Sequence, residues 1–410
     1  MKRLLILGGG TAGTIMANKM RKDLASSDWE IAVVDREESH YYQPGFLFMP
    51  FGYLKKKDVV KPTGKFINRG INVVRNEIDS IETDSNRVLL KDSTSIGYDI
   101  LIIATGARIS PEDTPGLKGE LWGKKIFDFY TFEGAEALAT FFKTWEGGKL
   151  VINVADNPIK CPVAPLEFAF YADDFFTKKG IREKVDITYV TPMSGAFTKP
   201  KASKMLGSLL EKKNINLVPD FFLGEVDNEN NRILDFGGRE VPFDCLVSVP
   251  LHSGDPAIAR SGISDEFGFV KADKFTLQVN GHSNIFAIGD AANLPSSKAG
   301  SVAHFQAEVL HENILSYIEG KPLKAMFDGH SNCFIETGYG KSILIDFNYE
   351  TEPLPGKFPL PVAGPFKLLG ESRLNHIGKL AFRWIYWNIL LKARYLPISN
   401  KMSMKGKILN

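Results

Sequence analysis

The stretch KRLLILGGGTAG, at residues 2–13, decides the fold of this 410-residue chain. It opens on a mostly apolar run that predicts a buried strand, and the glycines that follow have the spacing GxGxxG. A helical pattern begins directly afterwards, so the loop stands between a strand and a helix, as in a dinucleotide-binding turn. Gly8 permits the tight turn, Gly10 lets backbone amides approach a pyrophosphate, and Gly13 lets the helix pack on the strand.

An acidic residue follows the loop at the distance that such a turn requires. The predicted strand at residues 30–34 ends in Asp35, roughly 20 residues beyond the glycines, where a carboxylate holds a ribose hydroxyl. Thr11, Ala12 and Arg36 complete the candidate contacts of this half-site. These features predict a dinucleotide site and leave NAD and FAD both possible.

Two later segments bear on the choice between the two nucleotides. YDILIIATG, residues 98–106, is a strand pattern that ends in Ala-Thr-Gly, and NIFAIGDAA, residues 284–292, is one that ends in Gly-Asp at the head of a predicted helix. With the glycine loop, they resemble the signatures of the flavoprotein disulfide reductase superfamily, whose members have two dinucleotide-binding folds. By that resemblance the cofactor is FAD, Asp290 touches its ribityl chain, and the following helix directs the positive end of its dipole at the flavin. The further FAD contacts implied are Ala104, Thr105, Gly106, Gly289, Lys298, Ala299 and Gly300.

The middle of the chain begins like a second dinucleotide-binding domain but lacks the glycine turn. The strand pattern at residues 149–154 is followed by ADNPIK, which contains no glycine. Proline removes an amide donor, and side chains at every position obstruct a phosphate. The next strand pattern, residues 185–190, ends in Thr-Pro instead of an acid or a basic cluster. The sequence therefore predicts a second Rossmann-like domain with a degenerate NAD(P) site, which disfavours NAD(P)H as the electron donor.

A cysteine stands where that second glycine loop is expected. CPVAPLE, residues 161–167, resembles the CxxAPxE segment of the sulfide:quinone oxidoreductases and of the related flavocytochrome c sulfide dehydrogenases. The likeness spans nearly the whole chain, and its two cysteine segments are the most specific part. Further segments that resemble these families are YQP at residues 42–44, Lys298, NCFIE at residues 332–336 and GKLAF at residues 378–382.

The resemblance implies a redox pair of cysteines. Cys333 is expected beside the flavin ring, with Cys161 as its partner, linked to it directly or through further sulfur atoms. Thiolate–disulfide exchange lets hydrosulfide attack such a pair, and a thiolate over the flavin passes two electrons to it. Glu167 is the nearby acid–base candidate. Cys245 lies in a strand pattern that predicts a core position.

The same resemblance assigns the remaining contacts. Gln43 and Pro44 are expected to touch FAD. Phe334, Lys379 and Phe382 are expected to line a quinone site, where the lysine stabilises negative charge on the flavin or the quinone.

Two features depart from the family pattern. Residues 127–133 lack the third cysteine that many members carry, and Ala196 stands where members often have a histidine. A thioether link to FAD and a histidine base are therefore not assumed for this chain.

The carboxyl-terminal segment has a composition of its own. Residues 372–410 contain eight Lys or Arg and no Asp or Glu. Within them, residues 377–392 have helical character and include Trp384, Tyr386 and Trp387. This helix is shorter than the roughly 20 residues that span a bilayer, but it suits a helix lying in the headgroup region with its tryptophans at the interface. The segment predicts peripheral, monotopic membrane association, with packing on the protein or a dimer contact as alternatives.

The bulk composition disfavours several classes of protein. The formal net charge of +2 and the lack of an arginine-rich segment argue against a nucleic-acid partner. Three widely spaced cysteines do not form a disulfide framework or, with the scattered histidines, a metal site. The chain enters its first strand almost at once, so we expect no cleaved signal peptide.

These patterns predict an α/β protein with two Rossmann-like domains, the second inserted in the first. Residues 1–108 and 241–320 are assigned to the FAD domain, and residues 109–240 to the domain with the degenerate NAD(P) site. Residues 321–410 are assigned to a segment that caps the flavin and carries an amphipathic membrane-associating helix.

The predicted reaction is oxidation of hydrogen sulfide to sulfur or polysulfide, with electrons passing through the cysteine pair and FAD to a membrane quinone. A homo-oligomer is possible. One alternative is a single-subunit NADH:quinone dehydrogenase, against which the missing second glycine loop argues. Another is a flavocytochrome c-type sulfide dehydrogenase, disfavoured by the basic aromatic tail, and a third is a non-enzymatic, membrane-associated flavoprotein scaffold or sensor.

Overall fold

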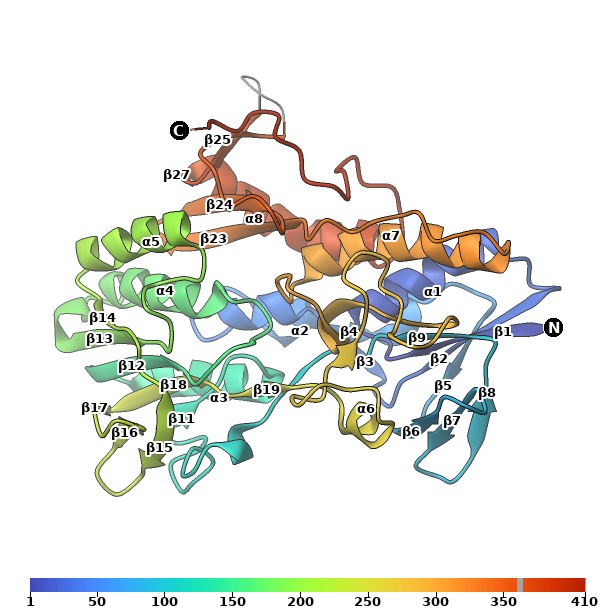
Figure 1. The fold of residues 1–410 in the computed structure, drawn as a ribbon. Coiled ribbons are helices and arrows are strands. Elements are labelled where there is room, and N and C mark those ends of the chain that lie inside the picture. The colour runs from blue at the N-terminus through green and yellow to red at the C-terminus, as the bar shows by residue number, and fades with distance from the viewer. Residues whose placement is uncertain (360–363, 410) are drawn as a thin grey trace.

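Two parallel sheets of five strands each carry the fold (Figure 1). The structure is a computed structural model that describes residues 1–359 and 364–409. Residues 360–363 and Asn410, which belong to the predicted carboxyl-terminal region, lie outside the described residues. The two sheets lie side by side, and the carboxyl-terminal strands contact helices of both halves (Figure 1).

The amino-terminal sheet is built around the strand that precedes the glycine loop. That strand, β1, pairs in parallel with β2 and β9, and all three are nearly continuous buried apolar runs, as expected of a sheet covered on both faces. The helices α1 (Thr11–Asp23) and α7 (Gly300–Ile318) pack against each other over one face (Figure 1). In spatial order the strands are β21 (Ile285–Ala287), β9 (Ile100–Ile103), β1 (Lys2–Leu7), β2 (Trp29–Val34) and β5 (Ile71–Val74).

Short elements complete this half of the molecule. Three antiparallel strands form a separate small sheet, and two others form a ribbon beside the short helix α2. They are β6 (Ile78–Glu82), β7 (Arg87–Leu90), β8 (Ser95–Gly97), β3 (Ser39–Tyr41), β4 (Val60–Pro62) and α2 (Lys56–Val59).

The middle sheet repeats the parallel arrangement. Its strands are β11 (Ile126–Phe127), β18 (Cys245–Val249), β12 (Gly148–Val154), β13 (Val185–Val190) and β14 (Asn216–Val218), in that spatial order. Its helices are α3 (Phe132–Thr144), α4 (Ala164–Lys178) and α5 (Pro200–Lys212). The antiparallel strands β15 (Leu223–Asp227), β16 (Arg232–Asp235) and β17 (Glu240–Pro242) extend from it (Figure 1). Cys245 is fully buried in this sheet.

The boundary predicted at residue 241 is wrong. Strand β18 lies between β11 and β12, so the chain returns to the first domain only after Val249. There β19 (His252–Ser253) pairs with β10 (Arg108–Ile109), and the two crossings between the domains run side by side. A short apolar run such as CLVSV has the same pattern in either parallel sheet, which is why the sequence misplaced it.

The carboxyl-terminal segment forms a third layer on top of both halves (Figure 1). Strands β23 and β24 form its hairpin, and the helix α8 packs across both of them. The elements are β23 (Ser331–Gly338), β24 (Lys341–Phe347), β25 (Gly356–Phe358), β26 (Phe366–Leu368), β27 (Glu371–Ser372) and α8 (Arg373–Ile385).

The end of α8 departs from the expected lipid-facing helix. A π-helical turn, Tyr386–Leu390, follows α8 and directs Tyr386 and Trp387 into the core, where the indole stacks on Phe66 with ring centroids 4.8 Å apart. The prediction that both tryptophans lie at a membrane interface is therefore wrong for Trp387, whereas Trp384 is exposed. Within residues 1–359 and 364–409, no helix combines the length and the apolar character needed to cross a membrane.

A buried ion pair anchors the end of the chain. Lys407 Nζ contacts Asp346 Oδ2, and His330 Nε2 lies 2.8 Å from Asp346 Oδ1. Burial alone would raise the pKa of Asp346, but His330 and Lys407 lower it below its ordinary value. A depressed carboxyl pKa stabilises the folded state above the pKa of unfolded aspartate, and this stabilisation is lost as the pH falls through the folded value.

Replacing Asp346 by asparagine should leave Lys407 as an uncompensated buried charge. We expect Asp346→Asn to lower the free energy of unfolding by about 3–5 kcal/mol, measured by thermal and denaturant unfolding at neutral pH. The matched control is Glu319→Gln, which removes an exposed ion pair with Lys321 and should cost less than about 1 kcal/mol. Equal effects of the two changes would contradict the anchoring role.

Candidate active site

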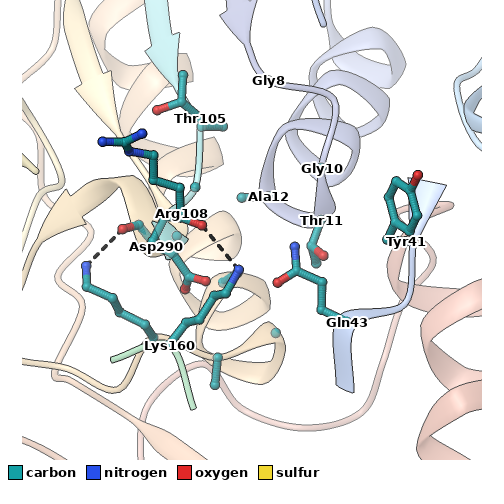
Figure 2. Close-up of a pocket in the computed structure, with 18 of the residues that line it drawn as sticks. Gly8, Gly10, Thr11, Ala12, Tyr41, Gln43, Thr105, Arg108, Lys160 and Asp290 are labelled. Carbon is teal, nitrogen blue, oxygen red and sulfur yellow. Dashed lines mark hydrogen bonds between the residues drawn. The ribbon is translucent and has the colours of Figure 1, made fainter. Parts of the chain in front are cut away.

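A cavity of about 720 Å³ lies where the glycine loop, the loop before α4, the strand β23 and the helix α8 meet. Figure 2 shows part of its lining, with the glycine loop on one side and Lys160 and Asp290 on the other. The structure brings every predicted site residue except Gly13 to this cavity. These are Gly8, Gly10, Thr11, Ala12, Asp35, Arg36, Gln43, Pro44, Ala104, Thr105, Gly106, Cys161, Glu167, Gly289, Asp290, Lys298, Ala299, Gly300, Cys333, Phe334, Lys379 and Phe382.

Steric constraints explain the glycines of the loop. Gly8 has φ +96°, and a Cβ there would lie 2.4 Å from the carbonyl oxygen of Ala104. Gly13 packs against the backbone of the loop, because a Cβ added there would lie 1.8 Å from the carbonyl oxygen of Gly8. Around Gly10, a Cβ would meet none of the described residues within 4 Å. Gly13 is thus required by the protein, whereas the side of Gly10 is open to a ligand.

Asp35 holds the loop as well as facing the cavity. Its Oδ2 accepts a hydrogen bond from the amide of Gly9, and its Oδ1 accepts one from the amide of Glu37 at 2.7 Å. Burial raises the pKa of this carboxyl, and the two amides and Arg75 oppose the rise. The carboxylate is therefore held in a fixed orientation at the end of β2.

Two lysines flank Asp290 on the opposite wall, of which Lys298 is buried and Lys160 is half-buried. Lys298 Nζ donates to the carbonyl oxygens of Asp290 and Ala292, at 2.9 and 2.8 Å, and Lys160 Nζ donates to that of Ala107 at 3.2 Å (Figure 2). Burial lowers the pKa of Lys298 to about 8, while Asp290 raises it. Residues 160 and 298 also form a β-bridge that fastens the two loops together. Sequence reasoning did not single out Lys160.

The helix predicted directly after Gly289 and Asp290 begins later. Residues Gly289–Ala291 form a 3-10 turn, β22 (Ala292–Asn293) follows, and α7 starts only at Gly300. Its first turn still lines the cavity. A loop with little helical pattern precedes α7, so the Gly-Asp signature marks the position of the acid and not the start of the helix.

Cys161 and Cys333 approach the cavity from different domains. Cys161 lies in the loop before α4, where its φ of +87° is strained for a residue with a side chain, and Cys333 lies in β23. Burial raises the pKa of both thiols, that of Cys333 to about 11, and Cys333 raises that of Cys161 further. Lys379 lowers both pKa values, so its charge favours the thiolate forms.

A buried ion pair lies next to the two sulfurs. Lys379 Nζ lies 2.9 Å from Glu167 Oε1 and donates to the carbonyl oxygen of Phe334 at 2.9 Å, while the amide of Glu336 donates to the same Glu167 oxygen at 2.8 Å. Burial raises the pKa of Glu167, and Lys379 opposes that rise. The pair therefore joins α4, β23 and α8 at one point.

The inner face of α8 supplies an aromatic wall. Phe382 and Tyr386 line the cavity together with Phe334 of β23. The ring of Phe334 packs edge-on against that of Phe366, with the ring centroids 5.5 Å apart. The hydroxyl of Tyr386 lies 2.7 Å from Thr11 Oγ1, so the carboxyl-terminal helix is fastened directly to the glycine loop. Sequence reasoning assigned Tyr386 to the carboxyl-terminal helix and missed this contact.

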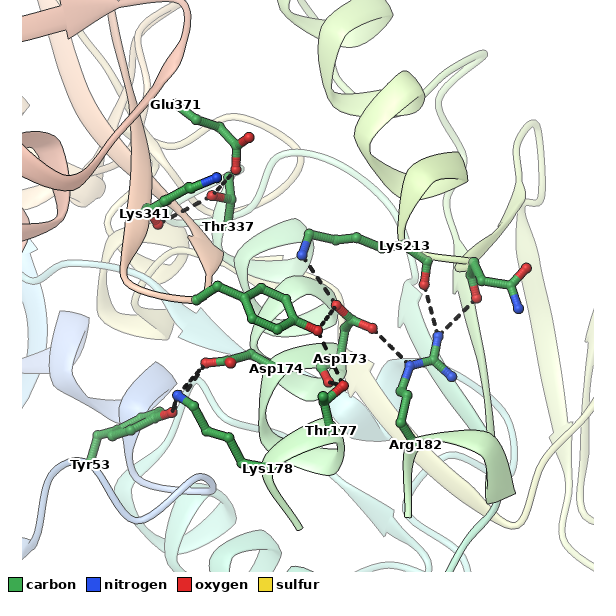
Figure 3. A network of polar contacts seen from close by, with 12 residues as sticks. Tyr53, Asp173, Asp174, Thr177, Lys178, Arg182, Lys213, Thr337, Lys341 and Glu371 are labelled. Carbon is green, nitrogen blue, oxygen red and sulfur yellow. Dashed lines mark hydrogen bonds and ion pairs between the residues drawn. The ribbon is translucent and has the colours of Figure 1, made fainter. Parts of the chain in front are cut away.

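A polar network holds α4 against the β23–β24 hairpin (Figure 3). Asp173 is paired with Arg182 at 2.8 Å and with Lys213 at 3.1 Å, and it accepts a hydrogen bond from the hydroxyl of Tyr339 at 2.9 Å. Tyr339 lies in the turn of the hairpin that carries Cys333. The network therefore fixes the strand of one cysteine against the helix that follows the other.

Comparison with known proteins agrees with this geometry. Residues 2–152 match the family described as pyridine nucleotide-disulphide oxidoreductase. The chain is 30% identical over 399 residues to the mitochondrial sulfide:quinone oxidoreductase of Dictyostelium discoideum, covering 96% of this chain and 86% of that protein. It is 27% identical over 398 residues to the mitochondrial sulfide:quinone oxidoreductase of Mus musculus, covering 95% and 86% of the two chains.

The fold has a close match among solved structures. The X-ray structure of the sulfide:quinone oxidoreductase from Aquifex aeolicus superposes with a TM-score of 0.80 at 20% identity, covering 96% of this chain and 92% of that chain. The predicted α/β fold class is confirmed. The matched family and relatives imply a flavin cofactor.

Gly10 and Gly13 provide a matched pair of substitutions that tests the flavin site. Gly10→Ala should leave the far-ultraviolet circular dichroism and the melting temperature of the flavin-free protein unchanged, but lower the flavin content several-fold, because its methyl group enters the cavity. Gly13→Ala should destabilise the protein itself, because its methyl group meets the backbone of Gly8. Flavin-to-protein ratios from visible absorbance measure the first effect, and normal loading of Gly10→Ala would contradict the assignment.

Proposed function

The chain belongs to the sulfide:quinone oxidoreductase family, and from that membership and the site geometry we propose that it oxidises hydrogen sulfide and reduces a membrane quinone. The observation that carries the proposal is the convergence of Cys161 and Cys333 on the cavity that contains the glycine loop. The two cysteines are far apart in the sequence and come from different layers of the fold. The buried Glu167–Lys379 pair lies beside them.

We propose FAD as the flavin, because the lining fits both ends of that dinucleotide. The open side of Gly10 and the carboxylate of Asp35 suit the pyrophosphate and a ribose, and Asp290 with its two lysines suits the flavin end. When bound, FAD accepts two electrons from a thiolate and passes them to a quinone. The proposed contacts are the cavity residues named above, with Gln43 and Pro44 on the side of the glycine loop.

The cysteines provide the sulfide chemistry. In the oxidised pair, linked directly or through further sulfur atoms, hydrosulfide attacks one sulfur, the S–S bond breaks, and the other cysteine leaves as a thiolate. The attacked cysteine then carries the new sulfane sulfur. We assign the thiolate to Cys333, which lies with Phe334 and Lys379 at the aromatic wall, and the sulfane sulfur to Cys161. Lys379 stabilises the thiolate through its positive charge.

An anaerobic titration tests this assignment. Sulfide should reduce the flavin of the wild type, and decylubiquinone should then reoxidise it. Cys161→Ser and Cys333→Ser should each lose sulfide-driven reduction by a factor of at least about 10³, because the nucleophilic pair is broken. Cys245→Ser, in the core strand β18, is the control and should react normally. Rapid reduction by NADH but not by sulfide would instead establish an NADH:quinone dehydrogenase.

The outer face of α8 supports docking at a membrane surface. Leu374, Ile377, Leu380 and Trp384 are spaced along one side of the helix and are between 50 and 62% exposed. The segment around them is basic and lacks acidic residues. We propose that this face lies among lipid headgroups, which places the inner face, with Lys379 and Phe382, at the depth from which a quinone enters.

Vesicle binding tests the outer face. The double change Ile377→Asp and Trp384→Ser should weaken binding to vesicles of phosphatidylcholine and phosphatidylglycerol by about tenfold or more, because two apolar side chains lose their burial in lipid. Phe236→Ser, at an 83% exposed position in the middle domain, is the matched control and should not change binding. Sulfide should still reduce the flavin of both variants, and unchanged flotation of the double variant would contradict the proposal.

A further inference from the structure

Four cationic side chains from distant parts of the chain converge at the carboxyl end of α8. Lys61 lies in β4, Lys65 ends the 3-10 turn that follows β4, Arg383 lies in the last turn of α8, and Lys392 lies two residues after the π-helical turn. We call these four residues the basic cluster. Sequence reasoning counted only the last two, as members of the basic carboxyl-terminal segment.

The core holds two members of the basic cluster next to each other. The buried side chain of Asn18 donates, through Nδ2, to the carbonyl oxygens of Phe66 and Leu391, at 2.6 Å each. Lys65 directly precedes the first of these acceptors, and Lys392 directly follows the second. The two lysines therefore extend from adjoining stretches of backbone whose separation is fixed by a buried hydrogen-bonded side chain.

Contacts of their side chains orient the other two members. Lys61 Nζ lies 4.4 Å from the centroid of the Trp387 ring, where a cation is attracted by the negative face of the indole. Arg383 Nη1 lies 3.1 Å from Asp58 Oδ1, and this ion pair joins the end of α8 to α2. The indole and the carboxylate thus keep both cations on the same side of the molecule.

The basic cluster has a surplus of positive charge. Within the part of the chain that the structure describes, Lys61, Lys65 and Lys392 form no ion pair, and Asp58 is already paired with Arg383. Burial lowers the pKa of Lys61, and the other three cations of the cluster lower it further, while Asp58 opposes them. The cations repel one another, so an anion placed among them would relieve this repulsion.

The surroundings of the basic cluster favour a lipid as the source of that anion. Trp384, which is 62% exposed, is the neighbour of Arg383, and Tyr395, which is 87% exposed, lies three residues beyond Lys392. Exposed aromatic side chains beside cations are typical of a surface at the level of lipid headgroups. A soluble polyanion would neutralise the same charges but leave the apolar outer face of α8 in water.

We propose that the basic cluster binds the headgroup phosphate of an anionic phospholipid. This inference rests on the membrane docking in the proposed function. The phosphate oxygens accept hydrogen bonds from the lysine and arginine donors, and the negative charge of the lipid compensates the surplus. The outer face of α8 provides apolar insertion, and the basic cluster adds a polar contact at the end of this helix. Together the two contacts fix the orientation of the protein on the bilayer.

Flotation with two kinds of vesicle tests the site. The double change Lys61→Gln and Lys65→Gln should weaken binding to mixed vesicles of phosphatidylcholine and phosphatidylglycerol by roughly 25-fold at low salt, at about fivefold per cation. Binding to vesicles of phosphatidylcholine alone should not change. The matched control, Lys118→Gln with Lys124→Gln, removes the same charge from exposed positions of the middle domain and should affect neither binding. Equal losses in the two double variants would overturn the site.

A variant from the other side of the basic cluster and a salt titration extend the test. Lys392→Gln should weaken binding to the mixed vesicles about fivefold. Added salt should reduce the preference of the wild type for the mixed vesicles, because it screens charges near the surface, and should have much less effect on the double lysine variant. A wild type that binds both kinds of vesicle equally would contradict the site.

Two further outcomes separate this site from the docking of α8 and from a soluble partner. Ile377→Asp with Trp384→Ser should weaken binding to both kinds of vesicle, whereas the lysine variants should weaken binding to the mixed vesicles alone. A wild type that floats with neither composition would refute the membrane docking itself. Binding of the basic cluster to heparin, without preference for the mixed vesicles, would assign it to a soluble polyanion and overturn the lipid site.

Discussion

The contact between Glu167 and Lys379 is the constraint on which the arrangement of the site depends. Removing two charges from water costs several kcal/mol per ion, and the cost is recovered only if the partners meet with good geometry. Here one carboxylate oxygen accepts both the Lys379 ammonium and the amide of Glu336, so α4, β23 and α8 must come together at once. Cys161 precedes that helix and Cys333 lies in that strand, so the contact that satisfies the charges also positions the sulfurs.

The same contact couples the chemistry to the surface of the protein. Burial disfavours both thiolates, and Lys379 supplies the positive charge that opposes this effect. Because Lys379 lies on α8, the group that favours the thiolates lies on the helix whose outer side exposes Trp384. Tyr386 then fastens the end of this helix to Thr11. The electrostatics of the site and the position of its aromatic wall are therefore set by the same thirteen-residue helix.

The sequence predicted those parts of the site whose constraints are local. The glycine loop could be identified because Gly8 and Gly13 are crowded by their own backbone, and Cys161 and Cys333 because their flanking residues resemble a family pattern. The inward turn of Trp387 could not be predicted, since a helix that is apolar on most of its circumference does not show which side it buries. The contact of Tyr386 with Thr11 was missed for a related reason, because it joins two layers of the fold.

The loop before α4 places a cysteine where a dinucleotide-binding turn would place a glycine. A dinucleotide turn requires glycines at positions with positive φ, and this loop retains one such position, at Cys161, with φ +87°. Holding a side chain there costs of order 1–3 kcal/mol, which glycine would avoid. The surroundings impose the conformation, since the bridge between Lys160 and Lys298 fixes one side of the residue and α4 the other. The side chain is thereby directed to the cavity, where a sulfur atom can react and a glycine cannot.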